Sequence, residues 1–189
     1  MKKKMTAIAM CICILAGMIT GCNASDQKKT EARTKKEITI AVNSETGGMD
    51  PAGNIALTYL SYSVTALDEL LTFDENGEIE YRAAQSYEVN EDSTEWTFHL
   101  RDNLKWSNGD PITAQDFKNG WLRALKPETA SEYAYMLYPI KNAEKYNKKE
   151  GTAEEVGIKV IDDKTLEVEL GTPVPYFDSL VAFKTYMPL

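Results

Sequence analysis

Nucleophiles and metal ligands are the residue types that would reveal an enzyme, and this 189-residue chain has few of them. His99 is the only histidine. It falls on the polar side of a predicted strand, so neither a catalytic triad nor a multi-histidine metal site is favoured. No serine lies in a Gly-x-Ser-x-Gly setting, and no glycine-rich phosphate loop occurs. The residue inventory therefore argues against an enzyme, and we expect no metal and no cofactor.

Two pairs of adjacent carboxylates are the other candidates for chemistry. Asp162 and Asp163 fall in a predicted hairpin turn, where aspartate bonds to the local backbone. Glu154 and Glu155 fall in a predicted first helical turn, where negative charge is favourable against the helix dipole. Structural roles explain both pairs. An acid–base pair stays an open alternative, because the sequence does not give the distances between carboxylates.

Tyrosines gather in the stretch "SEYAYMLYP", which contains Tyr133, Tyr135 and Tyr138. Tyrosine offers a large contact area with a polar tip and loses little entropy on binding, which suits a ligand cleft. Packing in the core is the alternative for each of them. The tryptophans Trp96 and Trp106 are expected on apolar faces, together with Trp121.

The three cysteines, Cys11, Cys13 and Cys22, all lie near the N-terminus. A disulfide framework or a thiolate metal cluster is therefore excluded for the rest of the chain. Three lysines at positions 2–4 precede an uncharged run over 5–19. That run is short for a membrane span, which needs roughly 20 apolar residues, and the pattern predicts an export signal over 1–21.

The residues "ITGC", at positions 19–22, resemble the lipobox of bacterial lipoproteins. The resemblance implies that the mature chain begins at Cys22 and carries lipid there. Two acyl chains give a stable membrane anchor, since each buried methylene adds roughly 0.8 kcal/mol. An ordinary signal peptide with an incidental cysteine is the alternative. We expect the protein at the outer face of a bacterial cell membrane.

Residues 22–36 are predicted to form a flexible tether, because 23–36 contain no aromatic residue and no aliphatic residue larger than alanine. Loss of 1–21 removes three lysines and leaves 18 basic and 29 acidic side chains, a formal charge of −11. Nucleic acid needs a basic surface. The acidic balance therefore excludes a nucleic-acid partner.

Strand and helix patterns begin after the tether. Alternating apolar residues predict a strand at 38–42, and apolar residues at three- and four-residue steps from Leu57 to Leu71 predict a helix. A turn is expected over 74–78. Trp96, Phe98 and Leu100 alternate with polar residues after an acidic turn, which predicts a hairpin with one apolar face.

The second half of the chain mixes helices with another hairpin. Thr113 and Asp116 match a capping box, before a helix expected to end ahead of Pro127. Short helices are predicted over 132–137 and 143–149. A hairpin follows over 157–170, and then a proline-started helix over 172–183. The mixture predicts an α/β or α+β fold.

The stretch from Ala83 to Phe117, "AAQSYEVNEDSTEWTFHLRDNLKWSNGDPITAQDF", is similar to the signature region of extracytoplasmic solute-binding proteins of family 5. The segments 48–54 and 162–177 also resemble the oligopeptide-binding branch. The family resemblance implies a periplasmic-binding-protein-like fold with two lobes and an extra insert domain. By this analogy 37–73 and 158–189 belong to lobe I and 74–157 form the insert. The second lobe would be absent.

The same resemblance implies a function. Members of the branch capture extracellular oligopeptides and deliver them to the permease of an ABC importer. The family's peptide-binding positions fall on Ile55, Ala56 and Leu57, where the ligand main chain would be bound, and on Tyr133. A monomer is expected. A receptor for a signalling peptide, or for nickel or another solute, is the alternative.

Overall fold

The computed structural model describes residues 50–52 and 67–189, which all belong to one compact unit, Val42–Leu189. The predicted signal, tether, strand at 38–42 and most of the predicted helix at 57–71 lie outside the described residues. The expected end of that helix is wrong. Leu71 instead begins strand β1, Leu71–Phe73, and residues 67–70 are not helical.

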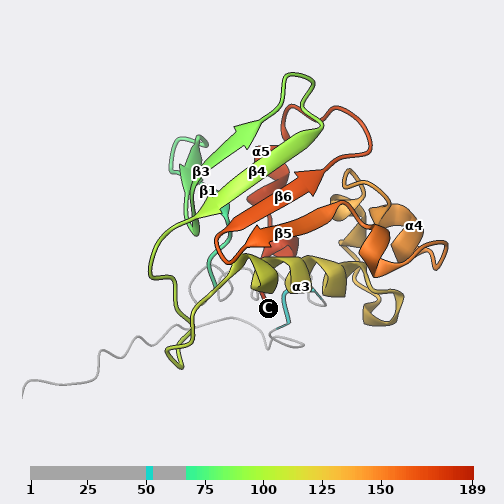
Figure 1. Cartoon of the computed structure of the whole chain (residues 1–189), viewed down its shortest axis with the longest axis horizontal. Helices are drawn as coiled ribbons and strands as arrows, with labels where there is room; N and C mark the ends of the chain where they lie inside the picture. Colours follow the sequence, from blue (N-terminus) through green and yellow to red (C-terminus); the bar gives the residue numbers. More distant parts are fainter. Residues whose placement is uncertain (1–49, 53–66) are drawn as a thin grey trace, which may run out of the picture. The chain divides into compact units, whose positions relative to one another are not determined.

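A four-stranded antiparallel sheet in the order β3-β4-β6-β5 is the centre of the unit (Figure 1). Its strands are β3 (Ala84–Val89), β4 (Glu95–Leu100), β5 (Ile158–Asp162) and β6 (Thr165–Glu169). The β3–β4 and β5–β6 hairpins are both as predicted. They are joined through the pairing of β4 with β6, in which Phe98 lies opposite Leu166.

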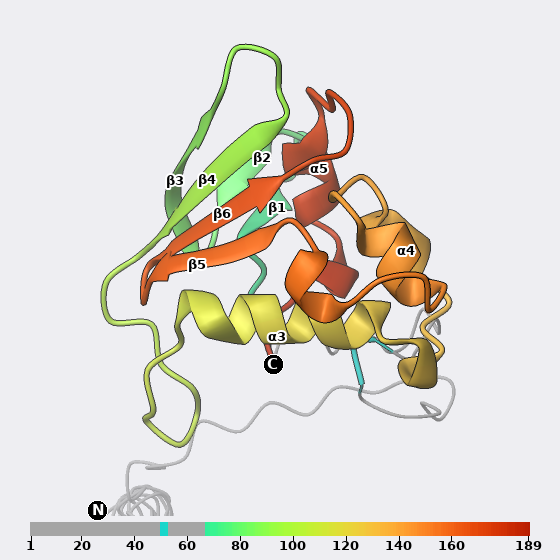
Figure 2. The same ribbon diagram turned by 45° about the vertical axis from the view of Figure 1, so that its right-hand side comes forward.

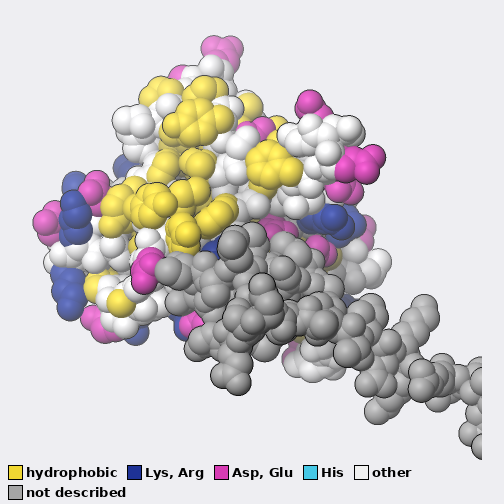
Figure 3. Space-filling model, turned by 180° about the vertical axis from the view of Figure 1, so that it is seen from behind, with side chains coloured by type: hydrophobic (Ala, Val, Ile, Leu, Met, Phe, Trp, Pro, Cys, Tyr) yellow, Lys and Arg dark blue, Asp and Glu magenta, His cyan; other side chains and the backbone are white. Residues whose placement is uncertain are grey.

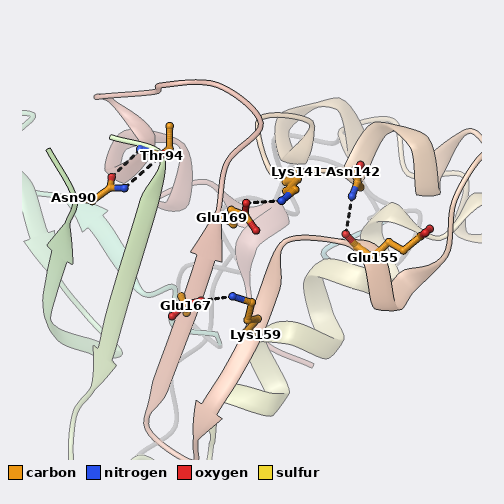
Figure 4. Close-up of polar contacts among 8 residues, drawn as sticks. All are labelled: Asn90, Thr94, Lys141, Asn142, Glu155, Lys159, Glu167 and Glu169. Carbon is orange, nitrogen blue, oxygen red and sulfur yellow. Dashed lines mark hydrogen bonds and ion pairs between the residues drawn. The ribbon is translucent and has the colours of Figure 1, made fainter. Parts of the chain in front are cut away.

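The turn between β3 and β4 is closed by a single amide side chain. Asn90 Oδ1 accepts hydrogen bonds from the backbone N–H groups of Thr94 and Glu95, each at 2.9 Å. Its Nδ2 donates to Thr94 Oγ1 (Figure 4). Such side-chain bonds to the local backbone are the reason asparagine favours turns, and they set the register of the hairpin.

One face of the sheet is apolar and the other is polar. Trp96, Phe98 and Leu100 of β4 are buried, as the alternation predicted. The opposite face carries ion pairs, one between β5 and β6 and one between β6 and the segment ahead of α4 (Figure 4). Lys159 Nζ lies 2.6 Å from Glu167 Oε1, and Lys141 Nζ lies 2.5 Å from Glu169 Oε1. Exposed pairs of this kind contribute at most about 1 kcal/mol each.

The longest helix of the described residues, α3 (Ala114–Leu125), packs beside β5 (Figures 1 and 2). The predicted capping box at its start is confirmed, since the Thr113 N–H and hydroxyl both donate to Asp116 Oδ2, at 2.6 and 2.8 Å. The helix ends at Leu125, ahead of Pro127, as expected. It buries Phe117 and Trp121 against the unit.

Short helical segments complete the unit. The α-helices are α4 (Ala143–Asn147) and α5 (Phe177–Val181); the 3₁₀ segments are η2 (Pro127–Thr129), η3 (Ala134–Leu137), η4 (Ala153–Glu155) and η5 (Lys184–Tyr186). Segments η3, α4 and η4 match the helical segments predicted near 132–137, 143–149 and 154–155. The proline-started helix predicted over 172–183 is shorter than expected, because α5 begins at Phe177, after both prolines, and η2 and η5 were not predicted. Within 50–52 and 67–189, no helix is long and apolar enough to cross a membrane.

A second, two-stranded sheet pairs β1 with β2 (Ile79–Tyr81), on the side of the large sheet where α5 lies (Figure 2). Phe177 of α5 packs against both Trp96 and Phe98, with ring centroids 5.7 and 6.4 Å away. The mixed α/β fold class is therefore confirmed.

Candidate functional site

Of the predicted site residues, Tyr133 is the one that lies among the described residues. It lies immediately before η3 and is partly buried. Its ring centroid is 5.3 Å from that of Phe183 and 6.0 Å from that of Tyr135. Lys184 Nζ stands 5.2 Å from the centroid of the Tyr133 ring. A cation at this distance from an aromatic face is attracted by the ring quadrupole.

The segment η5 holds these neighbours in place through Tyr186, which is fully buried. The Tyr186 hydroxyl donates to the Met136 carbonyl of η3 at 2.7 Å. Trp121 Nε1 of α3 donates to the Tyr186 carbonyl, also at 2.7 Å. Burial raises the pKa of the Tyr186 hydroxyl above its usual range, so it stays protonated and remains a donor. The η3 and η5 segments are thus tied to each other and to α3.

Exposed aromatic surface lies next to this cluster. Tyr135 is 55% exposed although its ring is adjacent to Tyr133. Figure 3 shows hydrophobic side chains gathered on the face opposite the view of Figure 1. Elements on the side of β1, β2 and α5 carry large, half-exposed aromatic residues: Phe73, Tyr81 and Tyr176.

A cavity of about 500 Å³ lies beside the loop that precedes α3. Its lining includes Trp106, Leu104, Ile112 and Phe117, with Asp68 among its polar groups. The expectation that Trp106 packs on an apolar core face is wrong, because it is only partly buried and lies on a tight loop closed by the Trp106–Asp110 backbone bond.

Asp50 anchors the start of the predicted ligand-binding segment. Arg123 Nη1 of α3 donates to Asp50 Oδ1 at 2.7 Å, and Nη2 donates to Oδ2. Asp50 Oδ1 also accepts from the Ala52 N–H at 3.0 Å. The hydrogen bonds from Arg123 hold the pKa of Asp50 below its ordinary value. The residues expected to bind the peptide main chain, Ile55, Ala56 and Leu57, lie outside the described residues, as does Cys22.

The residues considered for catalysis occupy structural positions. His99 lies on the polar face of the sheet, with Nε2 3.7 Å from Glu88 Oε1. Asp162 ends β5 and accepts a bond from the Lys164 N–H, as a turn aspartate does. Glu155 closes a capping box with Thr152. In the described part of the chain no group of three or more His, Cys, Asp or Glu residues could hold a metal ion.

Sequence reasoning missed Phe183, Lys184 and Arg123. The first two lie 50 and 51 residues from Tyr133 along the chain, and no motif connects them to it. The acid–arginine pairing of Asp50 also spans 73 residues. These contacts join segments that are far apart in the sequence. The spacing of residues along one sequence does not show which distant segments pack together.

Comparison with known proteins identifies the family to which this fold belongs. Residues 78–189 match the family described as bacterial extracellular solute-binding proteins, family 5, middle part. The chain is 41% identical over 172 residues to the oligopeptide-binding protein OppA of Bacillus subtilis (strain 168), covering 90% of this chain and 31% of that protein. It therefore spans about a third of the length of the curated relatives it matches.

Solved structures agree. The substrate-binding domain of an oligopeptide ABC transporter from Bacillus anthracis superposes with a TM-score of 0.73 at 45% identity, over 75% of this chain and 27% of that one. Haemophilus influenzae OppA in complex with the peptide RPPGFSPFR gives a TM-score of 0.72 at 37% identity, over 75% and 28% of the two chains. The chain belongs to the family 5 bacterial extracellular solute-binding proteins.

Proposed function

We propose that the protein carrying this chain captures oligopeptides outside the cell and delivers them to the permease of an ABC importer. The observation that carries the proposal is the 41% identity, over 90% of the chain, to an oligopeptide-binding protein. Recognition through the ligand's main chain would let one receptor accept many sequences, because backbone N–H and C=O groups are the same in every peptide. Closure around the peptide then gives the permease a distinct state to recognise.

Peptide contacts are assigned to Ile55, Ala56 and Leu57, which follow the Asp50 anchor, and to Tyr133. The ion pair of Asp50 with Arg123 supports the first assignment, since it fixes the chain just ahead of that segment. The division into lobe I (37–73 and 158–189) and an insert (74–157) stays a prediction, and the pairing of β4 with β6 crosses its boundary at 157.

Mass spectrometry of the full-length protein, purified without denaturation, tests the ligand class. Peptides are expected among the molecules that co-purify. Recovery of nickel or of another solute, with no peptide, would contradict the proposal. Competition by a random tripeptide library then separates a permissive importer from a selective signalling receptor, because only the former loses its bound peptide to most members of the library.

A lipid anchor at Cys22 is the second part of the proposal, and it places the protein at the outer face of the membrane. The lipobox-like "ITGC" after a basic and apolar leader supports it. Labelling of cells with a radioactive fatty acid is expected to mark the wild-type protein and not Cys22→Ala. Equal labelling of the two proteins would exclude acylation at this residue.

A further inference from the structure

We propose that Lys184 is a positioning residue for Tyr133: its ammonium group and the adjacent Phe183 ring hold the Tyr133 ring in the orientation that meets the ligand. This inference rests on the proposed function, in which Tyr133 contacts the peptide. In this role Lys184 acts through the ring.

The geometry around the Tyr133 ring supports this role. Lys184 Nζ is 5.2 Å from the ring centroid, within the roughly 6 Å over which a cation is attracted to an aromatic face. The Phe183 ring lies 5.3 Å away at an interplanar angle of 59°, a tilted arrangement that aromatic pairs favour. Two consecutive residues therefore contact the same ring.

The burial of Lys184 favours its contact with the ring. The residue is 5% exposed, and lysine is almost never so buried unless it is paired. Burial lowers the pKa of the Lys184 ammonium, because the charged form has lost much of its hydration. A cation–π contact is stronger when the cation is desolvated. Lys184 is thus held where a flexible surface lysine would not stay.

The backbone that carries Lys184 is fixed relative to Tyr133. The Tyr186 hydroxyl joins η5 to the Met136 carbonyl of η3, and Trp121 joins the Tyr186 carbonyl to α3. A change at Lys184 therefore cannot be absorbed by sliding η5 past η3. Tyr133 remains partly exposed, and the exposed Tyr135 ring lies beside it.

The first test needs no ligand. The full-length protein is labelled with 3-fluorotyrosine, and the Tyr133 resonance in the fluorine NMR spectrum is identified by its loss in Tyr133→Phe. Lys184→Met keeps the chain length without the charge and is expected to shift and broaden that resonance. Lys184→Arg keeps the charge and is expected to leave the resonance sharp. Lys145→Met, an exposed lysine, is the matched control and is expected to change nothing.

An unchanged Tyr133 resonance in Lys184→Met would overturn the inference. Resonances of tyrosines far from η5, such as Tyr81, show whether the variant is folded. If the control tyrosine resonances also move in Lys184→Met, the Lys184→Arg variant becomes the test. A Tyr133 resonance that broadens in Lys184→Arg, despite the retained charge, would equally overturn the inference.

The second test measures binding of the peptide RPPGFSPFR by calorimetry in a double-mutant cycle. Lys184→Met is expected to weaken binding about fivefold when Tyr133 is present. It is expected to have no effect in a Tyr133→Leu background, and Lys184→Arg is expected to restore binding. Equal losses in both backgrounds would overturn the inference. Absence of binding by the wild-type protein would count against the proposed function, and the fluorine spectra would still decide the positioning.

Discussion

Gly120 lies in the middle of α3, where the backbone of residues 187–189 approaches the helix closely. A methyl group added there would lie 2.3 Å from the Met187 carbonyl oxygen and 3.3 Å from the Leu189 nitrogen. The Leu189 N–H donates to the Asp116 carbonyl at 3.0 Å, so the segment after η5 is bonded to the same helix. Gly120→Ala is therefore the substitution that tests the packing of this segment on α3.

The expected magnitude follows from two opposing effects. Alanine stabilises a helix interior by about 1 kcal/mol relative to glycine. Real Cβ atoms do not approach other atoms closer than 3.0 Å, so the Met187 oxygen must move by at least about 0.7 Å. Overpacking of this kind costs about 1–3 kcal/mol. With a cost near the middle of that range, Gly120→Ala lowers the free energy of unfolding by about 1 kcal/mol.

Urea denaturation of the full-length protein, followed by tryptophan fluorescence, measures this change. Asn119→Ala is the matched control, because Asn119 is exposed on the same helix and its substitution should change stability by less than about 0.5 kcal/mol. Helix propensity alone predicts the opposite order of the two variants. A Gly120→Ala protein as stable as the wild type, or more stable, would refute the close approach of Met187 to α3.

Three further outcomes are expected from the same assay. Asp116→Ala removes the acceptor of the capping box and should cost about 1 kcal/mol. Arg123→Gln should cost less than about 1 kcal/mol at neutral pH, since its ion pair with Asp50 is about 40% exposed. The pKa of Asp50 in the folded protein lies below 3.8, so the loss of unfolding free energy in Arg123→Gln should be complete above pH 3.8. It should vanish as the pH falls through the lowered pKa. A loss of stability that does not depend on pH would contradict this. Asn142 has a φ of 58° and donates to the Glu155 carbonyl (Figure 4). Asn142→Ala should therefore lower the unfolding free energy by about 1–2 kcal/mol, and Asn142→Gly by less, since glycine tolerates the positive φ. The reverse order would be inconsistent with backbone strain at this position.

Local patterns predicted the elements well. The alternation of Trp96, Phe98 and Leu100 predicted the buried face of β4. The Thr113–Asp116 spacing predicted where α3 begins. These signals succeed because a strand face and a helix cap are each decided by residues within a few positions of one another.

Contacts between distant segments were not predictable in this way. Leu71 continues a helical spacing in the sequence, yet it forms a strand because it pairs with Tyr81 across a turn. Trp106 is apolar but sits on a loop at the rim of a cavity. The placement of Lys184 against Tyr133 depends on the packing of η5 on η3. Tyr133 itself was a candidate from the tyrosine cluster, and only the family resemblance distinguished it from Tyr135 and Tyr138.

The order of strands in the large sheet also has a consequence for how the protein is made. β4 ends at Leu100, while its partner β6 begins at Thr165. At a synthesis rate of roughly 5–20 residues per second, the 64 residues between them take about 3–13 seconds to emerge. During that interval β4 has an unpaired edge and an apolar face, the combination by which strands associate with other chains. The nascent protein is therefore most exposed to aggregation between the emergence of β4 and that of β6, and a chaperone that shields Trp96 and Phe98 would protect it most in that interval.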